Sequence, residues 1–288
     1  MSTAKPILAG SAAAAIVAGS AAMLFPPFGE TRSLARADHA QFARVQSAFA
    51  GILAEHPSDM SVLEDLGFQA DRLTNAPGTK VIAEKAGSCA GQGIYWLRED
   101  AGAGLAITAP HRGSDRHTGS LAATLFLETG AKAAAWNSAP RRPTKQCDAA
   151  LDLAKEKNHV FSAFTTGFAE FARDSLIVQL HGFDGDRRKS LAAQEAGMIL
   201  SNGTERPSEK LLDLADCLSI AFNPERVLVY PVGTRELGAL KNAQGQLLRE
   251  AGFDGFVHME ISAGLRAELI EDGALRGKLA ACLVEAAK

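Results

Sequence analysis

The sequence has little excess charge of either sign. Its 288 residues include 30 Lys and Arg and 33 Asp and Glu, which gives a formal net charge of −3 at pH 7. The two signs are well mixed along the chain, without the basic patch that nucleic-acid-binding proteins use. The composition therefore argues against nucleic acid as a partner and favours a small-molecule or polymeric substrate.

Two kinds of chemical motif are also missing. The four cysteines, Cys89, Cys147, Cys217 and Cys282, have no CxxC spacing, which argues against a cysteine zinc site and a thioredoxin-like motif. The chain has no G-x-S-x-G elbow, so a serine hydrolase lacks support. In an oxidising compartment the cysteines allow three full disulfide pairings, and buried free thiols are the alternative.

Residues 1–37 differ in composition from the rest of the chain. Lys5 precedes an apolar Ala/Gly-rich run from Ile7 to Phe28, and Ala35-Arg36-Ala37 has the small-x-small pattern of a cleavage site. This layout predicts a secretory signal peptide. The alternative is an uncleaved membrane anchor, because about twenty apolar residues can span a bilayer. Both place the body, residues 38–288, outside the cytoplasm as a single α/β hydrolytic domain, periplasmic or secreted in the first case and membrane-anchored in the second.

The body shows an alternation of strands and helices. Residues 39–56 have apolar side chains at helical spacing, and the segment from there to Gly87 is expected to be irregular because of breakers such as Pro57 and Asn75-Ala76-Pro77-Gly78. Strands are predicted at 93–98, 104–109, 132–137, 175–181, 196–201, 226–230 and 254–260, and helices at 118–129, 148–172, 207–221, 242–251, 262–270 and 274–287. This order predicts an α/β fold with a mixed, mostly parallel sheet and helices on both faces. Only "EDAGAG" separates the first two strands, so we expect an antiparallel hairpin at one edge.

Ionisable groups follow several of these strands, in "TAPHRGSD", "AAWNSAPR", "VQLHGFD" and "VHMEIS". In open α/β sheets, ligands bind beyond the carboxyl ends of the strands. His111 and Asp115 share one tight loop around Gly113, and His181 follows from a separate strand. Two imidazoles and one carboxylate are the protein ligands of a catalytic zinc site, where water takes the fourth position. The sequence therefore predicts Zn²⁺ held by His111, Asp115 and His181.

Further polar residues have predicted roles around this metal. Glu260 is the candidate general base toward the metal's water. Arg141 is expected to stabilise the oxyanion or to bind a substrate carboxylate, with Asn137 as a neutral donor beside it. Asn242 is a candidate contact for a polar substrate. Two roles stay open for Arg112, a solvated surface residue or a residue that binds an anionic substrate. His258 is expected to be a satisfied core histidine, although it shares a strand face with Glu260.

The order His-xxx-Asp, an Asn and Arg pair, a "LHG" histidine and a late glutamate resembles the zinc carboxypeptidase and aspartoacylase pattern. Those families more often use His-xx-Glu, so the spacing and the Asp depart from the commonest form. The motifs "APHRGSD", "QLHGFD" and "FVHMEIS" with Arg266 are similar to N-formylglutamate amidohydrolases and poly-γ-glutamate hydrolase-like proteins over about residues 90–270. The resemblance implies a zinc carboxypeptidase-like (phosphorylase/hydrolase-like) fold and a zinc-dependent amidohydrolase, with ligand roles for His111, Asp115 and His181.

Two functional hypotheses follow. The first is an extracytoplasmic zinc hydrolase that cleaves an amide bond near a substrate carboxylate, in a peptide, a γ-glutamyl polymer or an N-acyl amino acid. The second is a catalytically inactive extracytoplasmic binding protein of the same fold. In either case the membrane would be a partner only if the N-terminal segment stays uncleaved.

Overall fold

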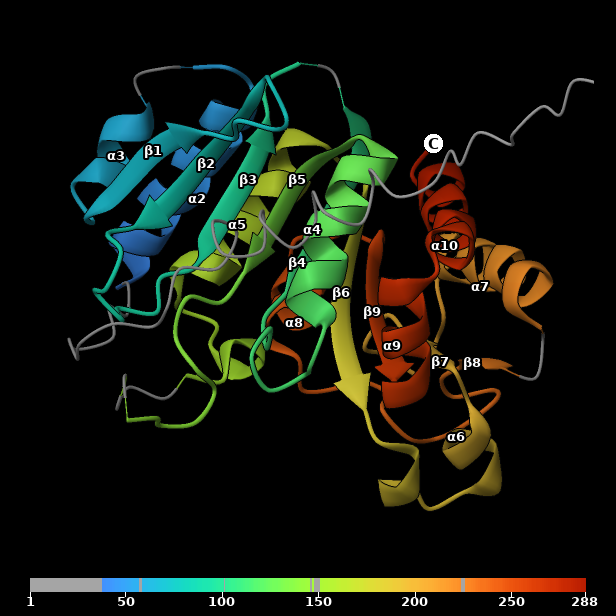
Figure 1. Cartoon of the computed structure of the whole chain (residues 1–288). Helices are drawn as coiled ribbons and strands as arrows, with labels where there is room; N and C mark the ends of the chain where they lie inside the picture. The colour runs from blue at the N-terminus through green and yellow to red at the C-terminus, as the bar shows by residue number, and fades with distance from the viewer. Residues whose placement is uncertain (1–37, 57–58, 101, 146, 148–150, 224–225) are drawn as a thin grey trace, which may run out of the picture.

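The structure is a computed structural model that describes residues 38–56, 59–100, 102–145, 147, 151–223 and 226–288 (Figure 1). The predicted signal peptide or membrane anchor, residues 1–37, lies outside the described residues. Among the helices that are described, none has the length and apolar character needed to cross a membrane.

The described strands form a nine-stranded mixed sheet in the order β1-β2-β3-β5-β4-β6-β9-β7-β8. Its centre is parallel, because β4 pairs in parallel with both β5 and β6, and β6 pairs in parallel with β9. Antiparallel pairs flank this centre, β3 against β5 on one side and β7 against β9 on the other. The strands are β1 (Phe68–Arg72), β2 (Thr79–Glu84), β3 (Ile94–Arg98), β4 (Ala103–Ala109), β5 (Ala131–Trp136), β6 (Leu176–Phe183), β7 (Met198–Ser201), β8 (Val227–Val229) and β9 (Phe256–Ser262).

Helices cover both faces of the sheet, so the predicted α/β class with a mixed sheet is confirmed (Figure 1). One face packs against α4 (Thr118–Thr129), α7 (Glu209–Phe222), α9 (Ala263–Glu271) and α10 (Gly273–Ala286). The other face packs against α2 (His39–Leu53), α3 (Met60–Glu64), α5 (Val160–Phe171) and α8 (Ala243–Glu250). The short α6 (Leu191–Glu195) follows β6.

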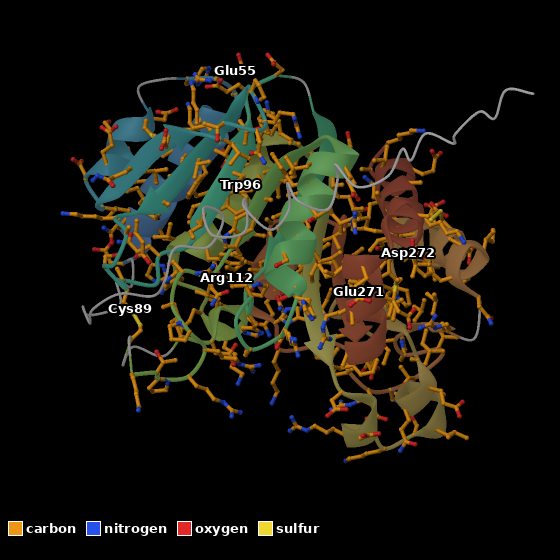
Figure 2. All side chains as sticks on the ribbon, in the orientation of Figure 1. Glu55, Cys89, Trp96, Arg112, Glu271 and Asp272 are labelled. Carbon is orange, nitrogen blue, oxygen red and sulfur yellow. A yellow bond between two sulfur atoms is a disulfide. The ribbon has the colours of Figure 1, made fainter. Side chains whose placement is uncertain are left out.

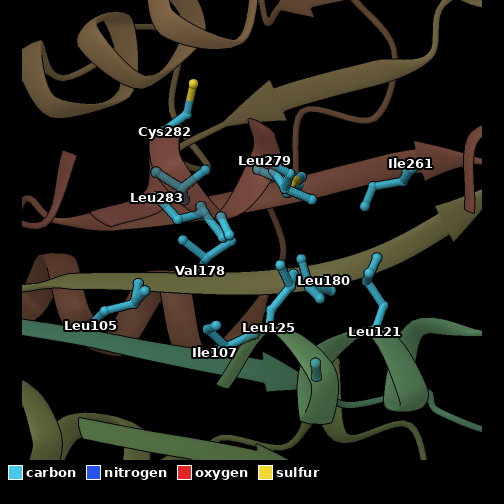
Figure 3. Packing of buried hydrophobic residues seen from close by; sticks show 14 of the residues in the cluster. Leu105, Ile107, Leu121, Leu125, Val178, Leu180, Ile261, Leu279, Cys282 and Leu283 are labelled. Atoms are coloured by element: carbon cyan, nitrogen blue, oxygen red, sulfur yellow. The ribbon is translucent and has the colours of Figure 1, made fainter. Parts of the chain in front are cut away.

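Strand alternation produces the two cores. Successive side chains of a strand point to opposite faces, so Val178 and Leu180 of β6 join one cluster while Ile177 joins the other. The first cluster is shown in Figure 3, where Leu121 and Leu125 of α4 face the sheet from the same side as Leu279 and Leu283 of α10.

The second face changes character toward the carboxyl ends of the central strands. Ile177 and Phe256 are apolar and pack against α5 and α8. Further along the same face of the same strands, side chains become polar, with Gln179 and His181 on β6 and His258 and Glu260 on β9. The apolar core therefore ends where a buried polar cluster begins.

The predicted hairpin of the first two strands is wrong. Residues 94–98 and 103–109 do form β3 and β4, but β5 lies between them and pairs with both. The residues from Leu105 to Ala109 are fully buried, and an edge strand would leave part of that run uncovered. The apolar strand therefore takes an interior place, and the edge is formed instead by β1 and β2.

Two further expectations are corrected by the structure. The segment expected to be irregular up to Gly87 contains α3 and the antiparallel pair β1–β2, with the predicted breakers Asn75 to Gly78 in the turn between the strands. The helix predicted at 148–172 begins only at Val160, after a short 3₁₀ turn at Leu153–Lys155. His159 starts it by accepting the N–H of Phe161 on its Nδ1 at 3.1 Å.

Two disulfides select one of the three pairings left open by the sequence. Cys217 joins Cys282 between α7 and α10, with the Cα atoms 5.7 Å apart. Cys89 joins Cys147 with a Cα separation of 6.1 Å. No free cysteine remains among the described residues, so the alternative of buried free thiols is wrong.

Candidate metal centre

The site lies where β4, β6 and β9 end side by side. Register pairs His181 of β6 with Glu260 of β9, and Gln179 with His258, so the four side chains form a block on one face. Pro110 follows the last residue of β4, and His111 comes next. Parallel strands bring their carboxyl ends to the same edge, and this explains why residues distant in sequence meet here.

A turn after β4 returns Asp115 to the sheet. The N–H groups of Ser114 and Asp115 donate to the His111 carbonyl at 3.0 and 2.9 Å, and this turn precedes α4. Oδ2 of Asp115 then accepts the N–H of Gly182 at 3.2 Å. The carboxylate is thereby fixed to the strand that carries His181.

One carboxylate oxygen lies equally close to two imidazoles. Oδ2 of Asp115 is 3.4 Å from Nδ1 of His111 and 3.4 Å from Nδ1 of His181. The two rings meet edge to face with centroids 4.9 Å apart. Ligands held 2.0–2.1 Å from a tetrahedral zinc ion are separated by about 3.3 Å, so this spacing fits a shared cation. Nδ1 of His111 is buried without a hydrogen-bond partner among the described residues, which also fits a metal ligand.

The opposite nitrogen of each imidazole has a partner of its own. Nε2 of His111 lies 2.8 Å from Oδ1 of Asp152, and Nε2 of His181 lies 3.0 Å from Oε1 of Gln179. A metal-binding imidazole usually donates its second N–H to such an acceptor, which orients the ring. Each histidine therefore has an acceptor on the Nε2 side and presents Nδ1 toward Asp115.

Sequence reasoning missed both of these acceptors. Gln179 had a usable signal, because it stands two residues before His181 on a strand and shares its face. Asp152 had none, since it lies in a segment that was predicted as part of a helix.

The charges in the cluster follow from burial and from these contacts. Burial alone lowers the pKa of His111, but the carboxylates of Asp115 and Asp152 outweigh it and raise this pKa above its ordinary value. Burial, with the neighbouring His111, lowers the pKa of His181 to about 4. Burial would raise the pKa of Asp115, yet the adjacent imidazoles of His111 and His181 hold it well below its usual range. Asp115 is thus an anionic group beside a neutral His181.

Glu260 and His258 complete the polar block. Glu260 is 8% exposed, and its Oε2 has no hydrogen-bond partner within the described chain. Burial, reinforced by the charge of Asp115, raises the pKa of Glu260 to about 7. His258 stacks on His181 with ring centroids 4.3 Å apart, and its Nδ1 also lacks a described partner. The expectation of a satisfied core histidine at 258 is therefore corrected.

A second set of ligand atoms shares His181. Side-chain atoms of His181, His258 and Glu260 lie within 4.8 Å of one another, as do those of His111, Asp115 and His181. The set with Asp115 is the better candidate, because Nε2 of His181 is engaged with Gln179 and Nδ1 faces Asp115. This leaves Glu260 beside the candidate ligand set without belonging to it.

A cavity of about 470 Å³ opens over the cluster and is lined by all five of these residues. Four cations also line it, namely Arg141, Lys155, Arg235 and Lys241. Arg141 and Lys155 both pair with Oδ2 of Asp152, at 2.9 and 3.2 Å. Lys241 has no ion pair within the described part of the chain. The cavity thus combines an anionic floor with a cationic rim.

The structure brings some of the predicted substrate residues to this cavity and leaves others away from it. Arg141 and Asn242 line it, whereas Asn137 and Arg112 are not among its described lining residues. Oδ1 of Asn137 accepts the backbone N–H of Arg112 at 2.8 Å, and its Nδ2 donates to the carbonyl of Ala139. Burial lowers the pKa of Arg112, labelled in Figure 2, to about 10. These two residues therefore shape the turn next to His111.

Two solved structures are distantly similar to this chain. YndL in its zinc-free form has 16% sequence identity and a TM-score of 0.34, over 68% of this chain and 87% of that one. A metallo-carboxypeptidase from Burkholderia cenocepacia has 11% identity and a TM-score of 0.37, over 83% of this chain and 66% of that one. The sequence matches no protein-family model and no curated protein. The likenesses are distant, so the case for a metal centre depends on the contacts described above.

Proposed function

We propose that this protein is a zinc-dependent hydrolase of amide bonds, with His111, Asp115 and His181 as the metal ligands. The observation that carries the proposal is the position of Asp115, whose Oδ2 lies 3.4 Å from Nδ1 of each histidine. Two nitrogens and one oxygen are a ligand set that zinc accepts in catalytic sites. Zinc bound there would lower the pKa of a water and polarise a carbonyl.

Glu260 is suited to act as the general base. Its buried carboxyl has a free oxygen and a pKa near 7, which is the range where a base can both lose and accept a proton at neutral pH. It shares the wall of the cavity with His181, its register partner. Glu260 would take a proton from the attacking water and pass it to the departing amine.

The rim favours a substrate with a carboxylate near the scissile bond. Lys241 has no anionic partner in the described structure, and Arg141 reaches the cavity beside Asp152. A guanidinium and an ammonium facing one cavity can bind a substrate carboxylate or stabilise an oxyanion. Peptides, γ-glutamyl chains and N-acyl amino acids have this arrangement. The two disulfides support a site of action outside the cytoplasm, as the N-terminal segment predicts.

The proposal is tested by metal content and hydrolysis together. Metal-free protein is titrated with Zn²⁺, bound metal is counted by mass spectrometry, and hydrolysis of dipeptides, γ-glutamyl oligomers and N-acyl amino acids is measured with and without a chelator. We expect one zinc per chain and zinc-dependent hydrolysis of at least one class.

Two variants separate binding from catalysis. Glu260→Gln should keep the zinc and lose turnover, while His181→Ala should lose both. A protein that binds no zinc would refute the proposal, and one that binds zinc and substrate without hydrolysis would favour the binding-protein hypothesis.

A further inference from the structure

Three buried amide side chains form a continuous network behind His181. Gln179 and Gln244 are fully buried and Asn242 is 5% exposed. Nε2 of Gln179 donates to Oε1 of Gln244 at 3.1 Å, while Oε1 of Gln179 accepts from Asn242 and lies 3.0 Å from Nε2 of His181. The network joins β6 to the N-terminal turn of α8.

A backbone carbonyl sets the orientation of Gln244. Nε2 of Gln244 lies 2.8 Å from the carbonyl of Leu153, which can only accept a hydrogen bond. The amino group of Gln244 must therefore face Leu153, and its Oε1 must face Gln179. Since Oε1 can only accept, Gln179 has to present its amino group to Gln244.

A backbone N–H independently sets the orientation of Asn242. Oδ1 of Asn242 accepts the N–H of Gly245 at 2.9 Å, as the cap of α8. Its amino group must then face Gln179, which has to present an oxygen. The two backbone groups thus require the same orientation of Gln179, with Oε1 directed at both Asn242 and His181.

We infer that Gln244 and Asn242, acting through Gln179, fix the tautomer of His181 in which Nε2 carries the proton and Nδ1 is free for a metal. The other tautomer would place the lone pairs of Nε2 and of the Gln179 oxygen against each other at 3.0 Å in a buried site, whereas Nδ1 has only the longer 3.4 Å contact with Oδ2 of Asp115. Reversing the Gln179 amide would set its amino group against that of Asn242 and its oxygen against that of Gln244. Gln179 is therefore a positioning residue for the metal ligand.

The choice of an amide also suits the charge of the site. Asp115, Asp152 and Glu260 already give the cluster three carboxyl groups, and all three line one cavity. His111 has the carboxylate of Asp152 as its acceptor, whereas His181 has a neutral oxygen. An uncharged acceptor orients the ring without adding a further negative charge.

The tautomer is tested directly by nitrogen NMR of the imidazoles in metal-free protein, at about pH 8 so that an ordinary histidine is neutral. The His181 signals are identified by their loss in His181→Asn. We expect the His181 ring of the wild-type protein to carry its proton on Nε2. In Gln179→Met the same ring should populate both tautomers. If the wild-type ring carries its proton on Nδ1, the inference is wrong, and this result alone is enough because it needs no substitution in the network.

The consequence for the metal rests on the proposed function and is measured separately, by competition with a zinc chelator. Gln179→Met should weaken zinc binding by about 10- to 100-fold, the usual effect of losing such an acceptor. Gln179→Glu keeps an acceptor for His181 but sets its second oxygen against Oε1 of Gln244, so it should restore only part of the affinity. If wild-type protein binds no zinc, the proposed function fails while the tautomer measurement still stands.

Ser162→Ala is the matched control. Oγ of Ser162 accepts a second hydrogen bond from Nε2 of Gln244 at 2.7 Å, but the Leu153 carbonyl remains to orient that amide. This variant should lower the unfolding temperature and leave both the tautomer and the zinc affinity as in wild type. Equal changes in Ser162→Ala and Gln179→Met, or no change in a folded Gln179→Met, would contradict the inference.

Discussion

The residue after His181 has to be glycine because a buried arginine occupies the space beside it. A Cβ added at Gly182 would lie 2.2 Å from Nη1 and 2.4 Å from Cζ of Arg266. Arg266 is 6% exposed, and its guanidinium donates to the carbonyls of Arg116, Phe183 and Ile261. The guanidinium cannot move away without breaking these bonds, so Gly182→Ala should be strongly destabilising.

The size of the effect follows from what must be displaced. Overpacking a filled site costs about 1–3 kcal/mol, and losing a hydrogen bond from a charged donor costs about 1.5–3 kcal/mol. With one such bond lost, the free energy of unfolding should fall by about 2.5–6 kcal/mol. For a domain of this size that corresponds to a drop in Tm of about 5–24 °C.

The assay is thermal and urea unfolding of metal-free protein, with Gly264→Ala as the matched control. A Cβ at Gly264, near the start of α9, would meet open space, so this variant should be neutral or gain up to about 1 kcal/mol. In an Arg266→Ala background the clash is absent, and the added cost of Gly182→Ala should largely vanish. A Gly182→Ala protein as stable as Gly264→Ala, or an undiminished cost in the Arg266→Ala background, would refute the reasoning.

Three further predictions concern the metal centre and the scaffold. Asp152→Asn leaves His111 with a weaker acceptor, so zinc affinity measured by chelator competition should fall, by at most about 100-fold; an unchanged affinity would argue against a role for Asp152. The pKa of Glu260 is raised from 4.5 to about 7 in the folded state, so its burial costs stability as the pH rises through this range. Metal-free Glu260→Gln should therefore have the same free energy of unfolding as wild type near pH 4, and a free energy about 3 kcal/mol higher above pH 8. A stability gain of equal size at both pH values would contradict this pH dependence. Replacing Cys217 and Cys282 by Ser opens a loop with a sequence separation of 65 residues. The free energy of unfolding, measured in urea, should fall by about 4 kcal/mol. Zinc affinity should not change, because the disulfide joins α7 to α10 away from the cavity.

Local sequence patterns were sufficient for the central strands and for the polar residues that follow them. The buried runs of β4, β6 and β9 are apolar over most of their length, and each ends in ionisable groups that a turn does not need. His111 with Asp115, and His181, were predicted from this pattern alone. The structure places their side-chain atoms together because parallel strands end at one edge.

The same patterns failed where the answer depends on which segments meet. The short connection "EDAGAG" suggested a hairpin, but β5, more than twenty residues later in the chain, separates β3 from β4. The hairpin β1–β2 was not predicted, because β1 is mostly exposed and its sequence does not alternate between apolar and polar residues. Strand order is a property of the whole sheet, and local spacing does not contain it.

The sequence by itself determined which side chains could bind a metal and which strand ends carry them, because periodicity and residue chemistry are local. Only the tertiary structure decided which nitrogen of each histidine faces Asp115. Asp152 reaches His111 from a distant segment, and Asn242 and Gln244, at the start of α8, hold the Gln179 amide that faces His181. Hydrogen bonds have direction, and their direction is fixed only when donors and acceptors from distant parts of the chain are buried together.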